Sequence, residues 1–239
     1  MINFLGKIMG SILRYVYMFV SSVLPSEPSV ISYYAIAIII TSIIFKLILL
    51  PISLNQVKSS RKMSELQPLI KDIQTKYKND PKTMQVKMQE LYKEHKYNPA
   101  SGCLVLIIQM PIILAFFAVF RDPATYAFTD AEMYANMAKN FLWISNLDLN
   151  DPYLWGLPLL AGITTYIQSI TMMSANPNAD PSTQSTQKIM NIVLPFMIFF
   201  AAQGFAAGLA LYWVISNIFS IIQQLIVNRS VKKAGGQNK

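Results

Sequence analysis

The sequence predicts an all-α integral membrane protein with five transmembrane helices, and three observations support this fold class. The chain has 239 residues, of which 53% are hydrophobic. Only 13% are charged, whereas about a quarter of the residues are charged in a typical soluble domain. Five apolar stretches are each about 20 residues long, which is the length that a helix needs to cross the hydrocarbon core of a bilayer. These stretches are residues 30–50, 101–120, 153–173, 189–205 and 208–227.

Residues 1–29 form a separate region before the first stretch. Lys7 and Arg14 recur at helical spacing with other polar residues, and apolar side chains occupy the positions between them. This pattern is typical of an amphipathic helix that lies in the membrane interface. A signal peptide is the alternative, but the small-residue cleavage motif is weak and this region contains no cysteine for lipoprotein processing. We expect an uncleaved interfacial helix and a linker that contains Pro25 and Pro28.

The membrane core is predicted over residues 30–227, and its first span carries a lysine, Lys46, in an otherwise uncharged run. A lysine within the hydrocarbon costs at least ~2.5 kcal/mol, so it needs water, a partner or a function. Alternatively, its long stem lifts the ammonium group to the cytoplasmic interface.

A charged helical hairpin is predicted at residues 58–96, between the first and second spans. Apolar side chains recur at helical intervals on both sides of the turn at residues 79–81, and Pro68 interrupts or bends the first helix. Its two amphipathic faces favour a docking arm for a partner. The alternatives are a solvated loop that only satisfies the positive-inside rule and a pair of helices that pack on each other. The candidate site residues of the hairpin are Met63, Leu66, Pro68, Tyr77, Met88 and Leu91.

Basic residues between the spans predict the orientation. The net charge is +8, and ten of the twenty Lys and Arg residues lie in residues 56–100. Four more lie in the tail at residues 228–239, whereas residues 122–152 hold one lysine and five acidic residues. Because basic segments stay in the cytoplasm, we expect a multi-pass protein of the plasma membrane with its N-terminus outside and its C-terminus inside.

Polar residues in four of the spans lie at a similar depth, in the central and cytoplasmic part of the membrane. Residues three and four apart share a helix face, so these stripes can line one hydrophilic cavity open to the cytoplasm. Hydrogen bonding between helices in a tight bundle is the alternative. The candidate residues are Lys46, Ser42, Gln109, Thr164, Gln168, Tyr212, Trp213, Ser216, Asn217 and Ser220.

Catalytic and cofactor signatures are absent from the sequence. Its single cysteine and single histidine, Cys103 and His95, exclude a cysteine-rich or HExxH metal site. The sequence also has no GxSxG motif and no phosphate-binding glycine loop. We therefore predict no enzymatic activity, no metal and no cofactor.

Four stretches resemble the YidC membrane insertase family, which includes bacterial YidC and its mitochondrial and chloroplast relatives. They are FKLILLPISLNQ (45–56), MSELQPLIKDIQTKYKND (63–80), LYKEHKYNPASGCLVLIIQMPI (91–112) and LYWVISNIFSIIQQLIV (211–227). The chain is similar to the short, Gram-positive-like form, which lacks a large folded domain before the core. The resemblance implies a positively charged groove, open to the cytoplasm and to lipid, whose arginine is replaced here by Lys46. It also implies that Ser42, Gln168, Tyr212 and Trp213 line the groove or contact substrate, and that the hairpin receives the substrate.

We therefore expect an insertase and chaperone of nascent membrane proteins that acts in the lipid bilayer. The ribosome and the general secretion channel are candidate partners, and DNA is not. One alternative is a transporter of small solutes or ions with Lys46 as a ligand, although no paired repeat is visible. A structural assembly factor is another.

Overall fold

The structure is a computed structural model that describes residues 2–98, 104–172 and 189–236. Over these residues it consists of helices and loops, and the predicted all-α class is confirmed. In chain order the helices are α1 (Ile2–Val23), α2 (Tyr33–Ile48), α3 (Leu50–Lys76), α4 (Pro81–Glu94), α5 (Leu104–Arg121), α6 (Pro123–Tyr126), α7 (Ala131–Asn136), α8 (Leu157–Met172), the π-helical η2 (Ile189–Val193), α10 (Leu194–Ala202) and α11 (Ala207–Gly236).

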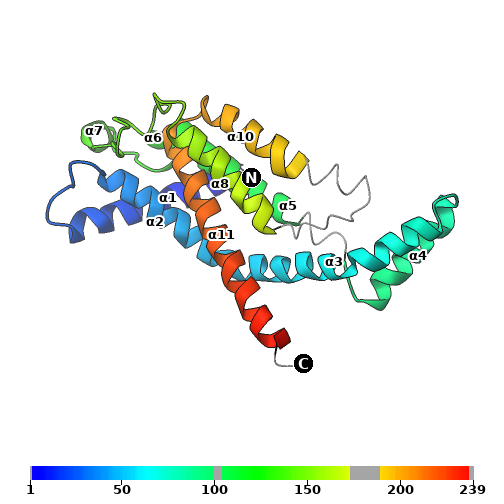
Figure 1. Cartoon of the computed structure of the whole chain (residues 1–239). Helices are drawn as coiled ribbons and strands as arrows, with labels where there is room; N and C mark the ends of the chain where they lie inside the picture. Colours follow the sequence, from blue (N-terminus) through cyan, green and yellow to red (C-terminus); the bar gives the residue numbers. More distant parts are fainter. Residues whose placement is uncertain (1, 99–103, 173–188, 237–239) are drawn as a thin grey trace.

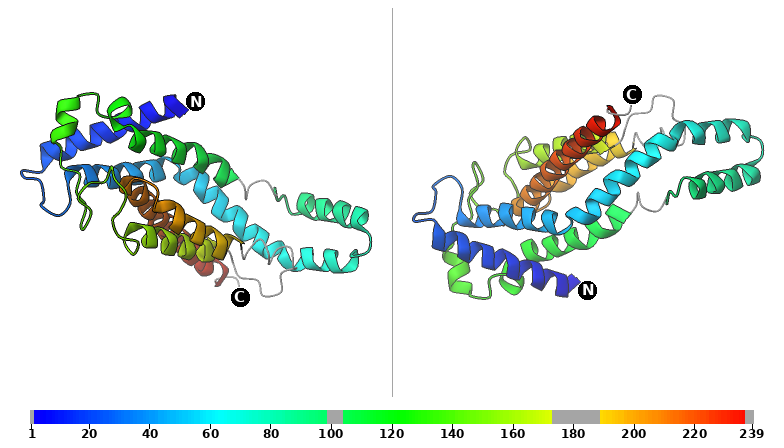
Figure 2. Two further views of the ribbon diagram at one scale, coloured as in Figure 1. Left: turned by 90° about the horizontal axis from the view of Figure 1, so that it is seen from above. Right: turned by 90° about the horizontal axis from the view of Figure 1, so that it is seen from below.

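The helices form a bundle in which α11 is central. Helix α11 packs along α8 and α2, α10 packs on α8, and α1 packs on α5 and α2 (Figure 1, Figure 2). Aromatic rings join these helices into one core. Phe116 of α5 stacks on Tyr212 of α11 with 3.8 Å between ring centroids, and Tyr34 of α2 meets Phe128 edge to face. Burial of these large rings fixes how the helices sit against one another.

Fewer helices of the structure have the length and hydropathy of a membrane span than the sequence predicts. Among the described residues, one continuous segment, Ala207–Val227, is long and apolar enough to cross a membrane. A second candidate is the bent pair Tyr33–Ile48 and Leu50–Ser59, whose halves meet at 59°. The segments Gln109–Arg121 and Asn191–Ala202 are apolar but shorter. The five-span arrangement therefore stays a prediction.

The bend between α2 and α3 has a local cause. Pro51 lies in the first turn of α3 and has no N–H to donate to a carbonyl of the preceding helix. Leu49 is the C-cap of α2, and its own N–H still donates to Phe45 O at 3.1 Å. The chain therefore changes direction after Ile48, two residues beyond Lys46, which lies in the last turn of α2.

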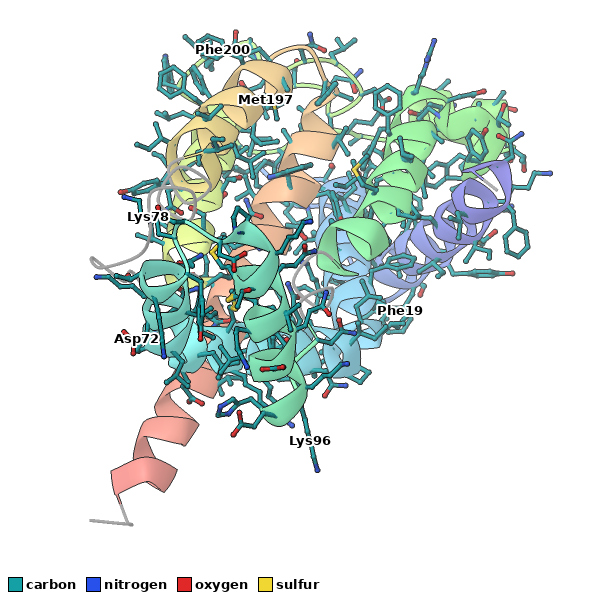
Figure 3. The ribbon with its side chains drawn as sticks, turned by 90° about the vertical axis from the view of Figure 1, so that its right-hand side faces the viewer. Phe19, Asp72, Lys78, Lys96, Met197 and Phe200 are labelled. Atoms are coloured by element: carbon teal, nitrogen blue, oxygen red, sulfur yellow. The ribbon has the colours of Figure 1, made fainter. Side chains whose placement is uncertain are left out.

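Helices α3 and α4 form a hairpin that projects away from the bundle (Figure 1). Leu66 and Ile70 of α3 and Leu91 of α4 are buried against each other. Met63, Met88 and other partly buried side chains surround them, so much of the predicted apolar face is used within the hairpin. Pro68 lies inside α3, which nevertheless continues past it. Figure 3 places Asp72, Lys78 and Lys96 on the outside of this hairpin.

The loops between α5 and α8 cover the end of the bundle at which α2 and α11 begin. The amides of Ala207 and Gly208, in the first turn of α11, donate to Leu149 O at 2.7 Å and Leu147 O at 2.8 Å. These bonds satisfy helix-end donors that would otherwise lack partners. At α2, Ser32 donates through both its amide and its hydroxyl to Asn140 O, at 3.0 and 2.8 Å. The loop therefore holds the starts of two helices together.

A carboxylate anchors this loop from within. Asp148 forms an ion pair with Lys139 at 2.9 Å and accepts hydrogen bonds from Tyr34 at 3.3 Å and Tyr134 at 2.5 Å. Burial, and then the bond to Asp148, raise the pKa of Tyr134, so this phenol keeps its proton. The loop is thus tied to α2 by side chains as well as by backbone.

The start of α8 and the end of α11 differ from the sequence-based boundaries. Helix α8 begins at Leu157 rather than at residue 153, because Asp151 accepts a bond from Leu157 N at 2.7 Å and turns the preceding residues into a loop. Helix α11 continues to Gly236, into the tail predicted for residues 228–239. Cys103 lies outside the described residues.

Candidate functional site

Lys46 reaches from α2 to α11. Its Nζ donates a hydrogen bond to Ser220 Oγ at 3.0 Å, and Ser220 in turn donates to Ser216 O at 2.9 Å. Over the described part of the chain, Lys46 has no carboxylate at ion-pair distance. A cation in the last turn of α2 is favoured by the negative end of the helix dipole. The charge is thus placed at the helix end and keeps its capacity to attract an anion.

A second polar cluster joins α8 to α11. Trp213 Nε1 donates to Thr165 Oγ1 at 3.0 Å. The Asn217 amide lies 3.1 Å from Thr164 Oγ1 and 2.9 Å from Thr165 Oγ1. With its oxygen and nitrogen exchanged, it also donates to Gln168 Oε1 at 2.6 Å while accepting from the threonines. That orientation gives Gln168 Oε1 a donor.

Two further contacts connect α11 with other helices. Gln109 Nε2 of α5 donates to Tyr212 Oη at 2.8 Å. Gln223 Nε2 donates to Ser53 Oγ of α3, also at 2.8 Å. Helix α11 therefore exchanges side-chain hydrogen bonds with α2, α3, α5 and α8, and it places its polar residues on several faces.

Two of the predicted residues are buried serines whose hydrogen bonds stay within their own helices. Ser42 is fully buried and donates to Ile38 O of its own helix at 2.6 Å. Ser216 is buried, and its carbonyl accepts from Ser220. The predicted residues therefore divide into the α2–α11 contact at Lys46, the α8–α11 cluster at Asn217 and the α5–α11 contact at Tyr212.

Sequence reasoning missed Thr165 and Ser53, although each completes one of these contacts. Thr165 follows the predicted Thr164 and accepts from Trp213. Ser53 lies beyond the predicted end of the first span. The spacing of Gln223 from Ser220 and Ser216 places them on a related helix face, but spacing does not reveal the partner helix.

The predicted hairpin residues lie together, at a distance from this site along α3. Leu66 and Leu91 are in the hairpin core, and Met63 and Met88 pack against it. Pro68 is exposed, and Tyr77 follows the end of α3. Within the described ranges, no group of three or more His, Cys, Asp or Glu residues is placed to hold a metal ion.

Comparisons with known proteins agree on one family. The family model described as 60Kd inner membrane protein matches residues 27–234. Similar curated proteins, each named membrane protein insertase YidC, occur in Oceanobacillus iheyensis, Helicobacter pylori and Mannheimia succiniciproducens. The chain is 38% identical to the first over 204 residues, covering 82% of this chain and 75% of the relative.

The other two relatives are longer. Identity to the H. pylori protein is 37% over 243 residues, covering 100% of this chain and 39% of the relative. Identity to the M. succiniciproducens protein is 39% over 208 residues, covering 87% of this chain and 35% of the relative. The chain thus spans little more than a third of the length of these two proteins.

Proposed function

The chain belongs to the 60Kd inner membrane protein family, and on this premise we propose that it inserts nascent proteins into the membrane and assists their folding there. Membership in this family makes it a membrane protein. The relatives named above are insertases, and the matched region runs from before α2 to residue 234 in the last turn of α11.

The environment of Lys46 is the main support for this proposal. Its ammonium group is held by a hydroxyl, Ser220, instead of by a described carboxylate. Hydrogen bonding to a neutral partner leaves the positive charge uncompensated, so an acidic segment of a client gains a favourable interaction by entering. The other polar contacts of α11 offer donors and acceptors to a client backbone, which lipid does not provide.

The proposed cycle uses two different surfaces of the bundle. A hydrophilic client segment enters a groove beside Lys46 from the cytoplasmic side. The client's apolar helix then passes into lipid along exposed apolar side chains, such as Ile163 and Tyr166 of α8. Burial of its apolar surface provides the driving force, at ~25 cal/mol per Å². This cycle makes and breaks no covalent bond and uses no cofactor.

The proposed topology places five spans in the membrane, with the N-terminus outside and the C-terminus in the cytoplasm. The loop anchored by Asp148 would then close the outer end of the bundle. Its bonds to the starts of α2 and α11 support this role, because they hold those helix ends together. The hairpin of α3 and α4 would lie in the cytoplasm.

Partners other than clients and lipid are also proposed. The four basic residues at positions 228–239 would contact ribosomal RNA, whose phosphates attract Lys and Arg. Truncation after Asn228 should then weaken co-sedimentation with ribosomes and flatten its salt dependence. An unchanged slope would leave the tail as a determinant of topology, as the positive-inside rule alone requires. The general secretion channel is a second candidate partner.

Site-specific photo-crosslinking tests the insertase proposal. A photoreactive residue at position 46 or 213 should crosslink to stalled nascent membrane proteins, but not to stalled soluble proteins. Position 196 is the matched control, because Phe196 is exposed on α10 and lies outside the polar contacts. Equal crosslinking from positions 46 and 196, with no preference for membrane clients, would contradict the proposed groove.

A further inference from the structure

A cavity of about 290 Å³ lies between α1 on one side and α6 with the residues that follow it on the other. It is distinct from the polar contacts of α11 and plays no part in the proposed insertion cycle. Its lining residues are Lys7, Ser11, Arg14, Tyr15, Thr125, Tyr126, Ala127 and Thr129. Two cations and several hydroxyl groups therefore converge on one hollow, and the eight residues include no acidic side chain.

Helix geometry brings these groups together. Lys7, Ser11 and Arg14 are four and three residues apart, so they share one edge of α1. The neighbouring face of α1 is buried in the core through Met9 and Leu13. Gly10 lets α1 approach the end of α6, since a Cβ there would lie 2.0 Å from Tyr126 O. This close approach forms the wall of the cavity.

The two cations are available to a ligand. Across the residues that the structure describes, neither Lys7 nor Arg14 forms an ion pair. The nearest acidic residues along the loop are already used as helix caps. Asp122 accepts from Thr125 N and Asp130 from Met133 N, each at 3.1 Å. The cavity therefore carries positive charge that the protein itself leaves unpaired.

An apolar surface continues from the cationic edge of α1. Phe4, Tyr15 and Phe19 are 68%, 72% and 65% exposed, and Figure 3 shows Phe19 projecting from this helix. A ligand that matches both parts has a negatively charged headgroup and hydrocarbon chains. A free phosphate ion would match the cations but would leave the exposed aromatic side chains uncovered.

We propose that this cavity binds the phosphate headgroup of an anionic phospholipid, with Lys7 and Arg14 as its cationic partners and Ser11 and Thr125 as hydrogen-bond donors. The acyl chains lie along the exposed apolar face of α1. In the topology proposed above, this lipid belongs to the outer leaflet. The inference does not require insertase activity, so either proposal can fail without the other.

The test measures lipid binding by the purified full chain in a neutral detergent. Phosphatidylglycerol and phosphatidylcholine are titrated separately, and bound lipid is counted by native mass spectrometry. The wild type should bind phosphatidylglycerol more tightly. Each removed cation should weaken that binding about fivefold, so the double variant K7Q/R14Q should bind about 25-fold more weakly. It should no longer distinguish the two lipids.

Two variants and a competitor complete the design. The variant K82Q/K93Q removes the same charge from α4 and should keep wild-type binding, whereas the exchange K7R/R14K keeps both charges at the cavity and should bind nearly normally. Full phosphatidylglycerol binding by a folded K7Q/R14Q variant would overturn the proposal. Inorganic phosphate that binds as tightly as the lipid and displaces it would overturn the lipid assignment.

Discussion

Lys46 and Ser220 are 174 residues apart in the chain, yet Nζ of one lies 3.0 Å from Oγ of the other. This contact connects the end of α2 to the middle of α11. A lysine that forms a salt bridge would be neutralised, whereas one bonded to a hydroxyl retains its field. The pairing therefore explains how a cation within an apolar run can have a hydrogen-bond partner and still attract the carboxylates of an acidic client.

The charge of Lys46 should matter more than its exact shape. Lys46→Arg should support insertion, whereas Lys46→Glu should reduce insertion of clients with acidic outer segments at least about fivefold. Even at the dielectric constant of water, one unit-charge pair at 4 Å contributes about 1 kcal/mol. Complementation of an insertase-depleted strain measures this, with a neutral-tailed client as the control. Equal loss for both clients would remove the electrostatic explanation.

Cysteine accessibility should distinguish a wet groove from a dry bundle. After Cys103→Ser, a cysteine at position 46 or 168 should react with a polar maleimide added from the cytoplasmic side, and not from outside. A cysteine at position 42 should remain unreactive, because Ser42 is fully buried. Protection at both 46 and 168 in an active protein would indicate that the polar residues serve only to pair helices.

The α8–α11 cluster should contribute measurably to stability through Thr165. Thr165→Val removes the acceptor of Trp213 and a partner of Asn217, and it should lower the free energy of unfolding by about 1–2 kcal/mol. Thr171→Val is the matched control, because its hydroxyl donates to Gln168 O within α8 and bonds to no other helix among the described residues. Denaturant titration in detergent compares the two. Similar losses would mean that the cluster adds little beyond ordinary packing.

Gly156 should not tolerate a side chain. A Cβ at this position would lie 2.3 Å from Asp151 Oδ2 and 2.8 Å from Trp143 Nε1, so Gly156→Ala should displace the carboxylate that caps α8. We expect a loss of about 1–3 kcal/mol in the free energy of unfolding. The contrast is Gly204→Ala, whose added Cβ would lie no closer than 3.6 Å to Ala201 O. A thermal unfolding scan should separate the two variants.

Acid should loosen the start of α4 through Asp80. Bonds from the Thr83 hydroxyl, at 2.6 Å, and from its amide, at 3.1 Å, lower the pKa of Asp80 from 3.8. Because the folded pKa is the lower one, this contribution is present above about pH 4 and is lost as the pH falls through the folded pKa. Hydrogen exchange of α4, corrected for intrinsic rates, should show this loss. Asp80→Asn retains a cap and should remove the pH dependence.

The amino-acid sequence by itself determined the helices and their approximate extents. Apolar runs and periodic apolar positions reflect burial along a single helix, which is a local property. The hairpin of α3 and α4 follows for the same reason, since Leu66 and Leu91 recur in phase with their neighbours. Lys46 and the polar residues of α11 were also identifiable, because a polar residue in an apolar run is conspicuous wherever it folds. The orientation and the number of spans remain predictions.

Only the tertiary structure decided which polar groups meet. Periodicity shows which residues share a helix face, but it does not say which helix packs on that face or at what height. Ser42 therefore bonds within α2, while Thr165 and Ser53 pair with α11. The cavity at Lys7 and Arg14 likewise depends on α6 and the residues after it, which are more than 100 residues away in the chain and pack against α1. Such contacts join distant segments through packing and shape, and helical spacing contains no information about either.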